Sequence, residues 1–183
     1  MTYGFWKEPD RWTAAYSARF PHIYIHGDRA IEYEHGGWEL PGRSDDLLKI
    51  GGKRIGPTEY EEVALGVPGV ASAAAVGIPD PVKGEAVLMV LSLAPNAHGR
   101  EDAIEREVRQ RVESALGKPF RISGVAFVSE LPVTRNAKVH RRVLRAWLSG
   151  TEPGDLSNLH NPESEAEIRS VGTQLVVSVR EVD

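Results

Sequence analysis

An unbroken apolar run from Ala86 to Leu91 is the feature that most constrains the fold. It lies inside a longer β-rich segment, residues 85–93, and predicts a central strand of a sheet. The run is far too short to span a bilayer. A second β-rich segment, residues 70–78, precedes it, and Pro79-Asp80-Pro81 marks a turn between the two. The sheet is therefore expected to be built around residues 85–93.

Helical periodicity flanks these two strands. Proline and glycine bound a predicted helix over residues 57–66, because proline suits the first helical position and glycine ends a helix. Apolar stripes predict a helix over residues 104–116 and a last helix over residues 139–148, with Lys138 in the first turn of the latter. Residues 124–129 predict a third strand between these helices.

The first 55 residues have a different rhythm. An irregular opening is followed by an expected strand at residues 23–25 and a hairpin over residues 30–40 that turns at His35-Gly36-Gly37. A further hairpin over residues 47–55 turns at Gly51-Gly52, a strong signal for a two-residue turn.

The order hairpin, helix, strand, strand, helix, strand, helix predicts an α+β fold, with a small, mostly antiparallel sheet packed with helices. We divide the chain into a β-rich segment at 1–42, a domain over 43–150 and a tail over 151–183. In the tail, the stretch up to residue 162 is expected to be a linker. It is followed by a short helix at 163–169 and a strand without an obvious partner at 174–179.

Composition excludes several classes of function. The net charge of −4 gives no global basic field for nucleic acid. The absence of cysteine excludes disulfides, thiolate metal sites and thiol catalysis, and it fits a cytoplasmic protein. The six histidines show no pattern of a metal site, so none is expected. The opening residues do not predict a signal peptide, and no membrane association is expected.

Two stretches carry a family resemblance. They are Gly42-Arg43-Ser44-Asp45-Asp46-Leu47-Leu48-Lys49-Ile50-Gly51-Gly52-Lys53-Arg54-Ile55-Gly56-Pro57-Thr58-Glu59 and Leu131-Pro132-Val133-Thr134-Arg135-Asn136-Ala137-Lys138-Val139-His140-Arg141-Arg142. Together they resemble the C-terminal lid domain of acyl-CoA synthetases of the adenylate-forming, AMP-binding superfamily. Val82-Lys83-Gly84-Glu85-Ala86, and in the tail Gly154-Asp155-Leu156-Ser157 and Asn161-Pro162-Glu163, are similar to acetyl-CoA synthetase-like members. The resemblance makes residues 1–42 a remnant of the large N-terminal domain.

The resemblance implies a nucleotide site at Asp28, Arg43 and Arg54. By composition alone, Gly27-Asp28 is a turn with a capping carboxylate. In the family, the residue matching Asp28 binds both ribose hydroxyls of ATP, and the residue matching Arg43 binds them from the other side. A carboxylate can accept two hydrogen bonds from a diol, and arginine adds fixed donors. Arg54 matches an arginine near the nucleotide phosphates.

The resemblance also implies a catalytic lysine, a hinge and a CoA-proximal loop. A surface lysine is the ordinary interpretation of Lys138, but the matching family residue lies between the acid's carboxylate and the α-phosphate of ATP. Asp45, otherwise part of an exposed acidic loop, matches the hinge about which the lid rotates. Gly51 and Gly52 match a loop along the pantetheine of CoA, where a missing side chain lets a ligand approach the backbone.

Other charged positions leave alternatives open. Arg141, Arg142 and Arg145 form a basic face that suits a solvated helix about as well as a domain interface or a phosphate. Glu113 stands where acetyl-CoA synthetases are expected to carry a basic residue for the CoA 3′-phosphate.

The implied parent reaction converts a small carboxylic acid, ATP and CoA into acyl-CoA, AMP and pyrophosphate through an acyl-adenylate. Magnesium would accompany ATP, and this chain alone is expected to bind neither ATP nor CoA tightly. The implied partner is an N-terminal AMP-binding domain, in the same or a separate chain, because the phosphate loop and acyl pocket of the family have no match here. The alternatives are a non-catalytic or complementing docking module and the lid of another adenylating enzyme.

Overall fold

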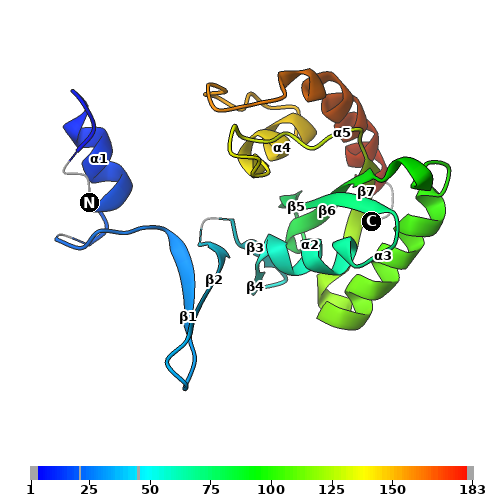
Figure 1. The fold of residues 1–183 in the computed structure, drawn as a ribbon, viewed down its shortest axis with the longest axis horizontal. Helices are drawn as coiled ribbons and strands as arrows, with labels where there is room; N and C mark the ends of the chain where they lie inside the picture. The colour runs from blue at the N-terminus through cyan, green and yellow to red at the C-terminus, as the bar shows by residue number, and fades with distance from the viewer. Residues whose placement is uncertain (1–3, 21, 45, 181–183) are drawn as a thin grey trace. The chain divides into compact units, whose positions relative to one another are not determined.

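The computed structural model describes residues 4–20, 22–44 and 46–180, with side chains described as far as residue 175. The chain divides into two compact units, residues 1–46 (the N-terminal unit) and residues 47–183 (the C-terminal unit). Figure 1 shows the elements of each. The candidate hinge, Asp45, lies outside the described residues.

The N-terminal unit consists of a helix and a hairpin. Helix α1 spans Pro9–Tyr16, and the antiparallel strands β1 and β2 span Asp28–Glu32 and Trp38–Arg43. The predicted hairpin is therefore confirmed, whereas the expected strand at residues 23–25 is wrong. Its residues follow the end of α1 instead, because Ile25 N–H donates to Tyr16 O (2.8 Å) and the Tyr24 ring stacks on that of Tyr16 with centroids 4.9 Å apart.

The C-terminal unit contains the predicted sheet with its helices. Its elements are β3 (Leu48–Ile50), β4 (Lys53–Ile55), α2 (Pro57–Leu65), β5 (Val70–Asp80), β6 (Gly84–Leu93), α3 (Glu101–Leu116), β7 (Ile122–Phe127), α4 (Arg141–Leu148) and α5 (Glu165–Arg180). Strand β6 is central, as predicted: β5 pairs with it antiparallel along its length, β3 antiparallel at its first residue, and β7 parallel. The only parallel pair among these described strands is β6 with β7, so the sheet is mixed and mostly antiparallel.

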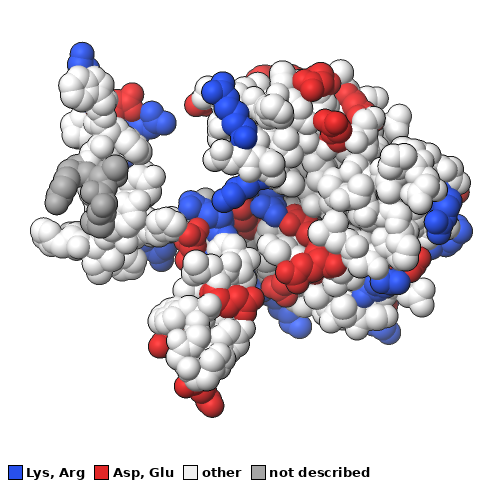
Figure 2. Space-filling model, viewed as in Figure 1, with Lys and Arg blue, Asp and Glu red and all other residues white. Residues whose placement is uncertain are grey.

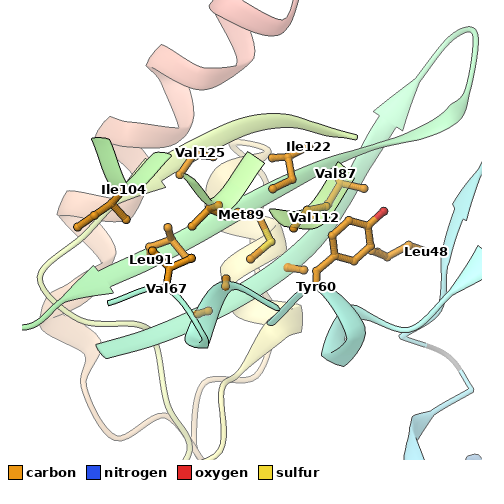
Figure 3. Close-up of a cluster of buried hydrophobic side chains, with 14 of the residues drawn as sticks. Leu48, Tyr60, Val67, Val87, Met89, Leu91, Ile104, Val112, Ile122 and Val125 are labelled. Carbon is orange, nitrogen blue, oxygen red and sulfur yellow. The ribbon is translucent and has the colours of Figure 1, made fainter. Parts of the chain in front are cut away.

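Two hydrophobic cores lie on opposite faces of this sheet. In Figure 1, α2 and α3 cover one face, and α4 and α5 cover the other. Successive side chains of a strand point to opposite faces. Val87, Met89 and Leu91 of β6 accordingly belong to the first core, shown in Figure 3, and the residues between them, such as Leu88, belong to the second. This explains why residues 86–91 are apolar throughout.

Helix α5 corrects the interpretation of the tail. The expected strand at residues 174–179 is wrong, since α5 continues from Glu165 to Arg180. Ile168 and Leu175, two helical turns apart, are buried in the second core. A Cβ on Gly172 would come within 2.8 Å of Leu148 Cα and O, so glycine permits the close approach of α5 to the end of α4. The β-branched residues near 176 read locally as a strand, but packing against α4 favours the helix.

None of the described helices is both long and apolar enough to cross a membrane. On the face that Figure 2 shows, acidic and basic side chains are interspersed over the C-terminal unit.

Candidate functional site

Lys138 lies on a short hairpin between β7 and α4, residues 133–139, which we call the lysine hairpin. Val133 and Val139 form an antiparallel bridge at its base. Thr134 N–H donates to Lys138 O and Ala137 N–H to Thr134 O, each at 2.8 Å. The backbone on both sides of Lys138 is therefore held by main-chain bonds, whereas its side chain is exposed.

The predicted place of Lys138 in a helical first turn is wrong. Helix α4 begins at Arg141, and His140 N–H donates to Pro132 O (2.7 Å), closing the loop before the helix. The helix dipole therefore gives no account of this lysine. The turn instead requires a left-handed backbone at Ala137, whose φ is +56°. Alanine occupies the conformation that a glycine would adopt without strain.

The candidate ribose-binding residues lie opposite each other in the N-terminal unit. Asp28 on β1 and Arg43 on β2 are register partners, and Arg43 Nη1 lies 3.4 Å from Asp28 Oδ1. The same Nη1 donates to His26 O (3.1 Å), and His26 Nδ1 bonds the other carboxylate oxygen of Asp28. Strand register thus joins two residues 15 positions apart, as their proposed common ligand requires.

The glycine before Asp28 allows this arrangement. Gly27 has φ +84°, and a Cβ there would lie 2.9 Å from Arg43 Nη2. Ser44 N–H and Oγ both donate to Gly27 O, at 2.8 and 2.9 Å. The chain therefore closes around the Asp28–Arg43 pair, and both side chains keep part of their surface exposed.

The remaining candidates share the β3–β4 hairpin. Gly51 and Gly52 form its turn with φ of +54° and +77°, and nothing lies within 4 Å of the space that a Cβ would occupy at either position. Lys83 O accepts a bond from Gly51 N–H at 2.8 Å. Arg54 follows on β4 and is exposed. The structure thus places Arg54 beside the glycine turn, while Lys138 lies on a separate loop of the same unit.

Comparison with known proteins identifies the C-terminal unit. Residues 59–138 match the family of AMP-binding enzyme C-terminal domains. The chain contains an AMP-binding enzyme C-terminal domain. The match runs from Glu59 near the start of α2 to Lys138 itself.

Relatives of this AMP-binding enzyme C-terminal domain are acyl-CoA synthetases by name. The acetyl-coenzyme A synthetase of Methanothrix thermoacetophila is 37% identical over 172 residues, covering 92% of this chain and 26% of the relative. The 3-hydroxypropionyl-coenzyme A synthetase of Sulfurisphaera tokodaii is 39% identical over 171 residues, covering 92% and 26%. The solved structure of acetoacetyl-CoA synthetase from Streptomyces lividans shares the fold, with a TM-score of 0.79 at 21% identity, covering 93% of this chain and 26% of that one. The chain spans about a quarter of the length of the curated relatives it matches.

The three arginines of α4 have structural partners within this domain. Arg141 forms a two-bond ion pair with Glu61 of α2, at 3.1 and 2.5 Å. Arg145 donates to Gly77 O (2.5 Å) and to Glu85. Arg142 donates to the carbonyl groups of residues 153 and 155. Neither of the interpretations left open for this basic face, a solvated helix or an interface or phosphate site, included these internal contacts. They join α4 to α2, to the sheet strands β5 and β6, and to the tail.

Glu113 forms an ion pair with Arg121 on the surface of the C-terminal unit. Both carboxylate oxygens accept bonds from Arg121, at 3.0 and 2.8 Å, and these bonds hold the pKa of Glu113 below its ordinary value. A carboxylate stabilised in this way is negative at neutral pH, so it does not attract a phosphate. Within the described residues, no group of three histidine or acidic side chains is placed to hold a metal ion.

Proposed function

We propose that this chain supplies the C-terminal lid of an ATP-dependent acid–CoA ligase that acts on a small carboxylic acid. In the first half-reaction, a carboxylate oxygen attacks the α-phosphorus of ATP and pyrophosphate leaves. In the second, the sulfur of CoA attacks the acyl carbon and AMP leaves. Support comes from the family match and from the acetyl- and 3-hydroxypropionyl-CoA synthetases among the relatives.

The observation that carries the proposal is Lys138, the last residue of the family match. Its side chain is exposed, and it lies directly after the turn of a hydrogen-bonded hairpin. Two anions, the acid and the α-phosphate, must approach each other during adenylation. A fixed ammonium group between them would stabilise the negative charge of the transition state. Within the described residues no carboxylate pairs with Lys138, so its charge is available for a ligand.

Asp28 and Arg43 suit a ribose diol. A carboxylate offers about four acceptor positions, so bonds from His26 and Arg43 leave room for two hydroxyl donors. Arg54 would contribute a forked guanidinium to the phosphates. Magnesium would enter with ATP and be held by its phosphate oxygens.

Asp45 would be the hinge about which the C-terminal unit rotates. The rotation would replace the lysine hairpin by the Gly51–Gly52 turn beside the reacting atoms. After adenylation, Lys138 would move away and the Gly51–Gly52 turn would face the pantetheine of CoA. The open space around both glycines suits a turn that a ligand approaches closely. The large AMP-binding domain would be the partner, and we expect the 183-residue chain alone to form neither acyl-adenylate nor acyl-CoA. ATP–pyrophosphate exchange with acetate, propionate and butyrate tests that expectation.

The test joins this chain to the AMP-binding domain of a relative, by fusion or by mixing. Lys138→Ala should lower the rate of adenylate formation by about 10²–10³-fold, because a charge stabilising the transition state is lost. Thioester formation from supplied acyl-adenylate should change far less. Lys118→Ala, which removes another exposed lysine of the same unit, is the matched control and should affect neither step.

Gly52→Leu should show the reverse pattern, slowing thioester formation and sparing adenylation. Gly52→Ala places the same strain on the turn, where φ is +77°, with less bulk, so it separates strain from obstruction. If Lys138→Ala left adenylation intact while slowing thioester formation, the roles assigned to the two loops would be wrong. If the chain were only a docking module, Lys138→Ala and Gly52→Leu would each support both half-reactions as well as the wild-type chain does.

A further inference from the structure

A segment of the tail, residues 158–161, runs along the outer edge of the lysine hairpin. Thr134 and Leu159 form an antiparallel bridge. Arg135 N–H donates to Asn158 O (3.1 Å), and His160 N–H donates to Val133 O (2.8 Å). The tail therefore adds a third, short strand-like edge to the hairpin that carries Lys138.

Asn161 ends this edge and uses its whole amide group. Its side chain is nearly fully buried, with the residue 3% exposed. Oδ1 accepts a bond from Val133 N–H (2.9 Å), and Nδ2 donates to Leu131 O (2.9 Å) and towards Glu130 Oε2 (3.4 Å). Ser164 Oγ in turn donates to Asn161 O at 2.8 Å. A single side chain thus bonds Glu130 and Leu131, which lead into the lysine hairpin, and Val133 at its base.

The contacts of Asn161 are transmitted to Lys138 through the first arm of the lysine hairpin, Val133 and Thr134. The backbone of Lys138 is bonded only to Thr134 among the hydrogen bonds of the described residues: its carbonyl accepts Thr134 N–H, and its N–H donates to Thr134 Oγ1 (3.3 Å). Thr134 follows directly after Val133, which Asn161 holds. The strained φ of +56° at Ala137 also persists only if the surrounding structure restrains the turn.

We propose that Asn161, with residues 158–160, is a positioning brace for Lys138, so that the tail takes part in adenylation without touching the substrates. The proposal rests on the proposed function of Lys138. The family match ends at residue 138, so the brace lies outside the matched region. A structural asparagine would stabilise the whole unit, whereas a brace affects the lysine hairpin and the step that needs it.

The chemical consequence is confined to one half-reaction. A catalytic group displaced by about 1 Å can lose roughly 10²-fold in rate, even when the altered residue is distant from the reacting atoms. Loosening the lysine hairpin should therefore slow adenylation. Thioester formation should be spared, because the proposed mechanism turns Lys138 away before CoA attacks.

The first experiment measures amide hydrogen exchange in the full chain. Asn161→Ala should make the amides of Thr134 and Ala137 exchange about tenfold faster, because the bonds to Val133 at the hairpin base and to Leu131 before it are lost. Amides of β5 and β6 should keep their wild-type rates. Asn158→Ala is the matched control, since Asn158 contacts the hairpin through its carbonyl group and the variant keeps that bond.

A second variant covers the case in which Asn161→Ala fails to fold. Asn161→Asp keeps the acceptor for Val133 N–H, loses the donor to Leu131 O and places two carboxylates beside each other at Glu130. It should accelerate exchange in the lysine hairpin, by less than the alanine variant where both fold. Unchanged hairpin exchange, or equal acceleration throughout the C-terminal unit, would overturn the proposal.

The second experiment measures both half-reactions with a supplied AMP-binding domain. Asn161→Ala should slow adenylation at least tenfold and leave thioester formation from acyl-adenylate near wild type. In a Lys138→Ala background, Asn161→Ala should slow adenylation no further. Equal loss in both half-reactions would refute a positioning role. If Lys138→Ala itself spared adenylation, the proposed function would fail, while hydrogen exchange would still decide whether Asn161 holds the lysine hairpin.

Discussion

Both units contain helix and paired strands, but they differ in burial. None of the described residues of the N-terminal unit is buried, and its exposed large apolar side chains are those of Phe5, Trp6, Phe20, Ile23, Ile31, Tyr33, Trp38 and Leu40. The C-terminal unit contains both cores. The β1–β2 hairpin forms through its turn and its register, and yet none of the residues of its two strands is fully buried. The local sequence pattern therefore specifies the hairpin, but a stable hairpin needs another element or partner to pack against its apolar side chains.

The exposed apolar side chains of the N-terminal unit fit the proposed partner. Large apolar side chains exposed in such number within one unit are typical of a surface that a partner covers. If an AMP-binding domain covers these residues, their contribution to stability appears only in the complex. In the isolated chain, cooperative unfolding should then report on the C-terminal unit alone.

Two tryptophans give the largest expected contrast. Trp147 on α4 is 1% exposed and packs in the second core, whereas Trp38 on β2 is 63% exposed. Trp147→Ala should lower the free energy of unfolding by about 3–5 kcal/mol, through lost burial and a cavity. Trp38→Ala should change it by less than about 0.5 kcal/mol. Urea denaturation of the isolated chain measures both, and similar losses would show that the N-terminal unit has a core of its own.

Two ion pairs provide the next contrast. Glu61 accepts bonds from Arg141 and from Ala75 N–H (2.9 Å) and is buried, while Glu8 pairs with Arg11 at the exposed start of α1. Glu61→Ala should cost roughly 2–4 kcal/mol, because it leaves a partly buried guanidinium and a backbone N–H without this acceptor. Glu8→Ala should cost less than about 0.5 kcal/mol, since exposed pairs contribute little. The measurement is thermal unfolding of both variants at low and at high salt. Equal responses of the two variants to salt would contradict the contrast between the buried and the exposed ion pair.

Most of the C-terminal unit could be predicted from the sequence because its elements have strong local signals. The apolar run at 86–91, the stripe from Ile104 to Leu116 and the Gly51–Gly52 turn each correspond to an observed element. The hairpin over residues 30–40 was also recognisable, whereas the proximity of Asp28 and Arg43 was implied only by the family resemblance. These features depend on neighbours a few residues away, which a sequence displays directly.

The errors occur where tertiary contacts decide. Helix α5 forms over valines that favour a strand locally, because Ile168 and Leu175 pack in the second core. The partners of the α4 arginines could not be chosen from sequence, since Glu61 is 80 positions from Arg141. Asn161 was noted only as part of a similar tail, and no local signal shows that its amide bonds Val133, 28 positions away.

Backbone strain offers a smaller contrast between the units. Ala137 in the lysine hairpin and Lys7 before α1 both have positive φ, +56° and +58°. Ala137→Gly should raise the free energy of unfolding by roughly 0.5–1 kcal/mol, because glycine relieves the left-handed strain at some cost in chain entropy. Lys7→Gly should leave the main unfolding transition unchanged. A stabilising effect of the Lys7 variant would mean that α1 unfolds together with the C-terminal unit.

The smallest expected effect is a pH dependence at the β5–β6 turn. Asp80 Oδ1 accepts bonds from Lys83 N–H (2.6 Å) and Val82 N–H (2.9 Å), and the Lys83 bond in particular holds the pKa of Asp80 below its ordinary value. A carboxyl group with a lowered folded-state pKa stabilises the fold above its unfolded pKa of about 3.9, and this contribution is lost as pH falls through the folded-state value.

Asp80→Asn should therefore be less stable than wild type at pH 7, and the difference should shrink as the pH falls below about 4. Urea denaturation between pH 7 and 3 measures this convergence. The control is Asp10→Asn, which makes the same chemical change in the first turn of α1 and should follow the wild-type curve throughout. A constant difference between Asp80→Asn and wild type across this range would mean that the turn depends on side-chain shape and not on the charge of Asp80. The two units would then differ in burial alone, because the charge of Asp80 would add nothing to the stability of the C-terminal unit.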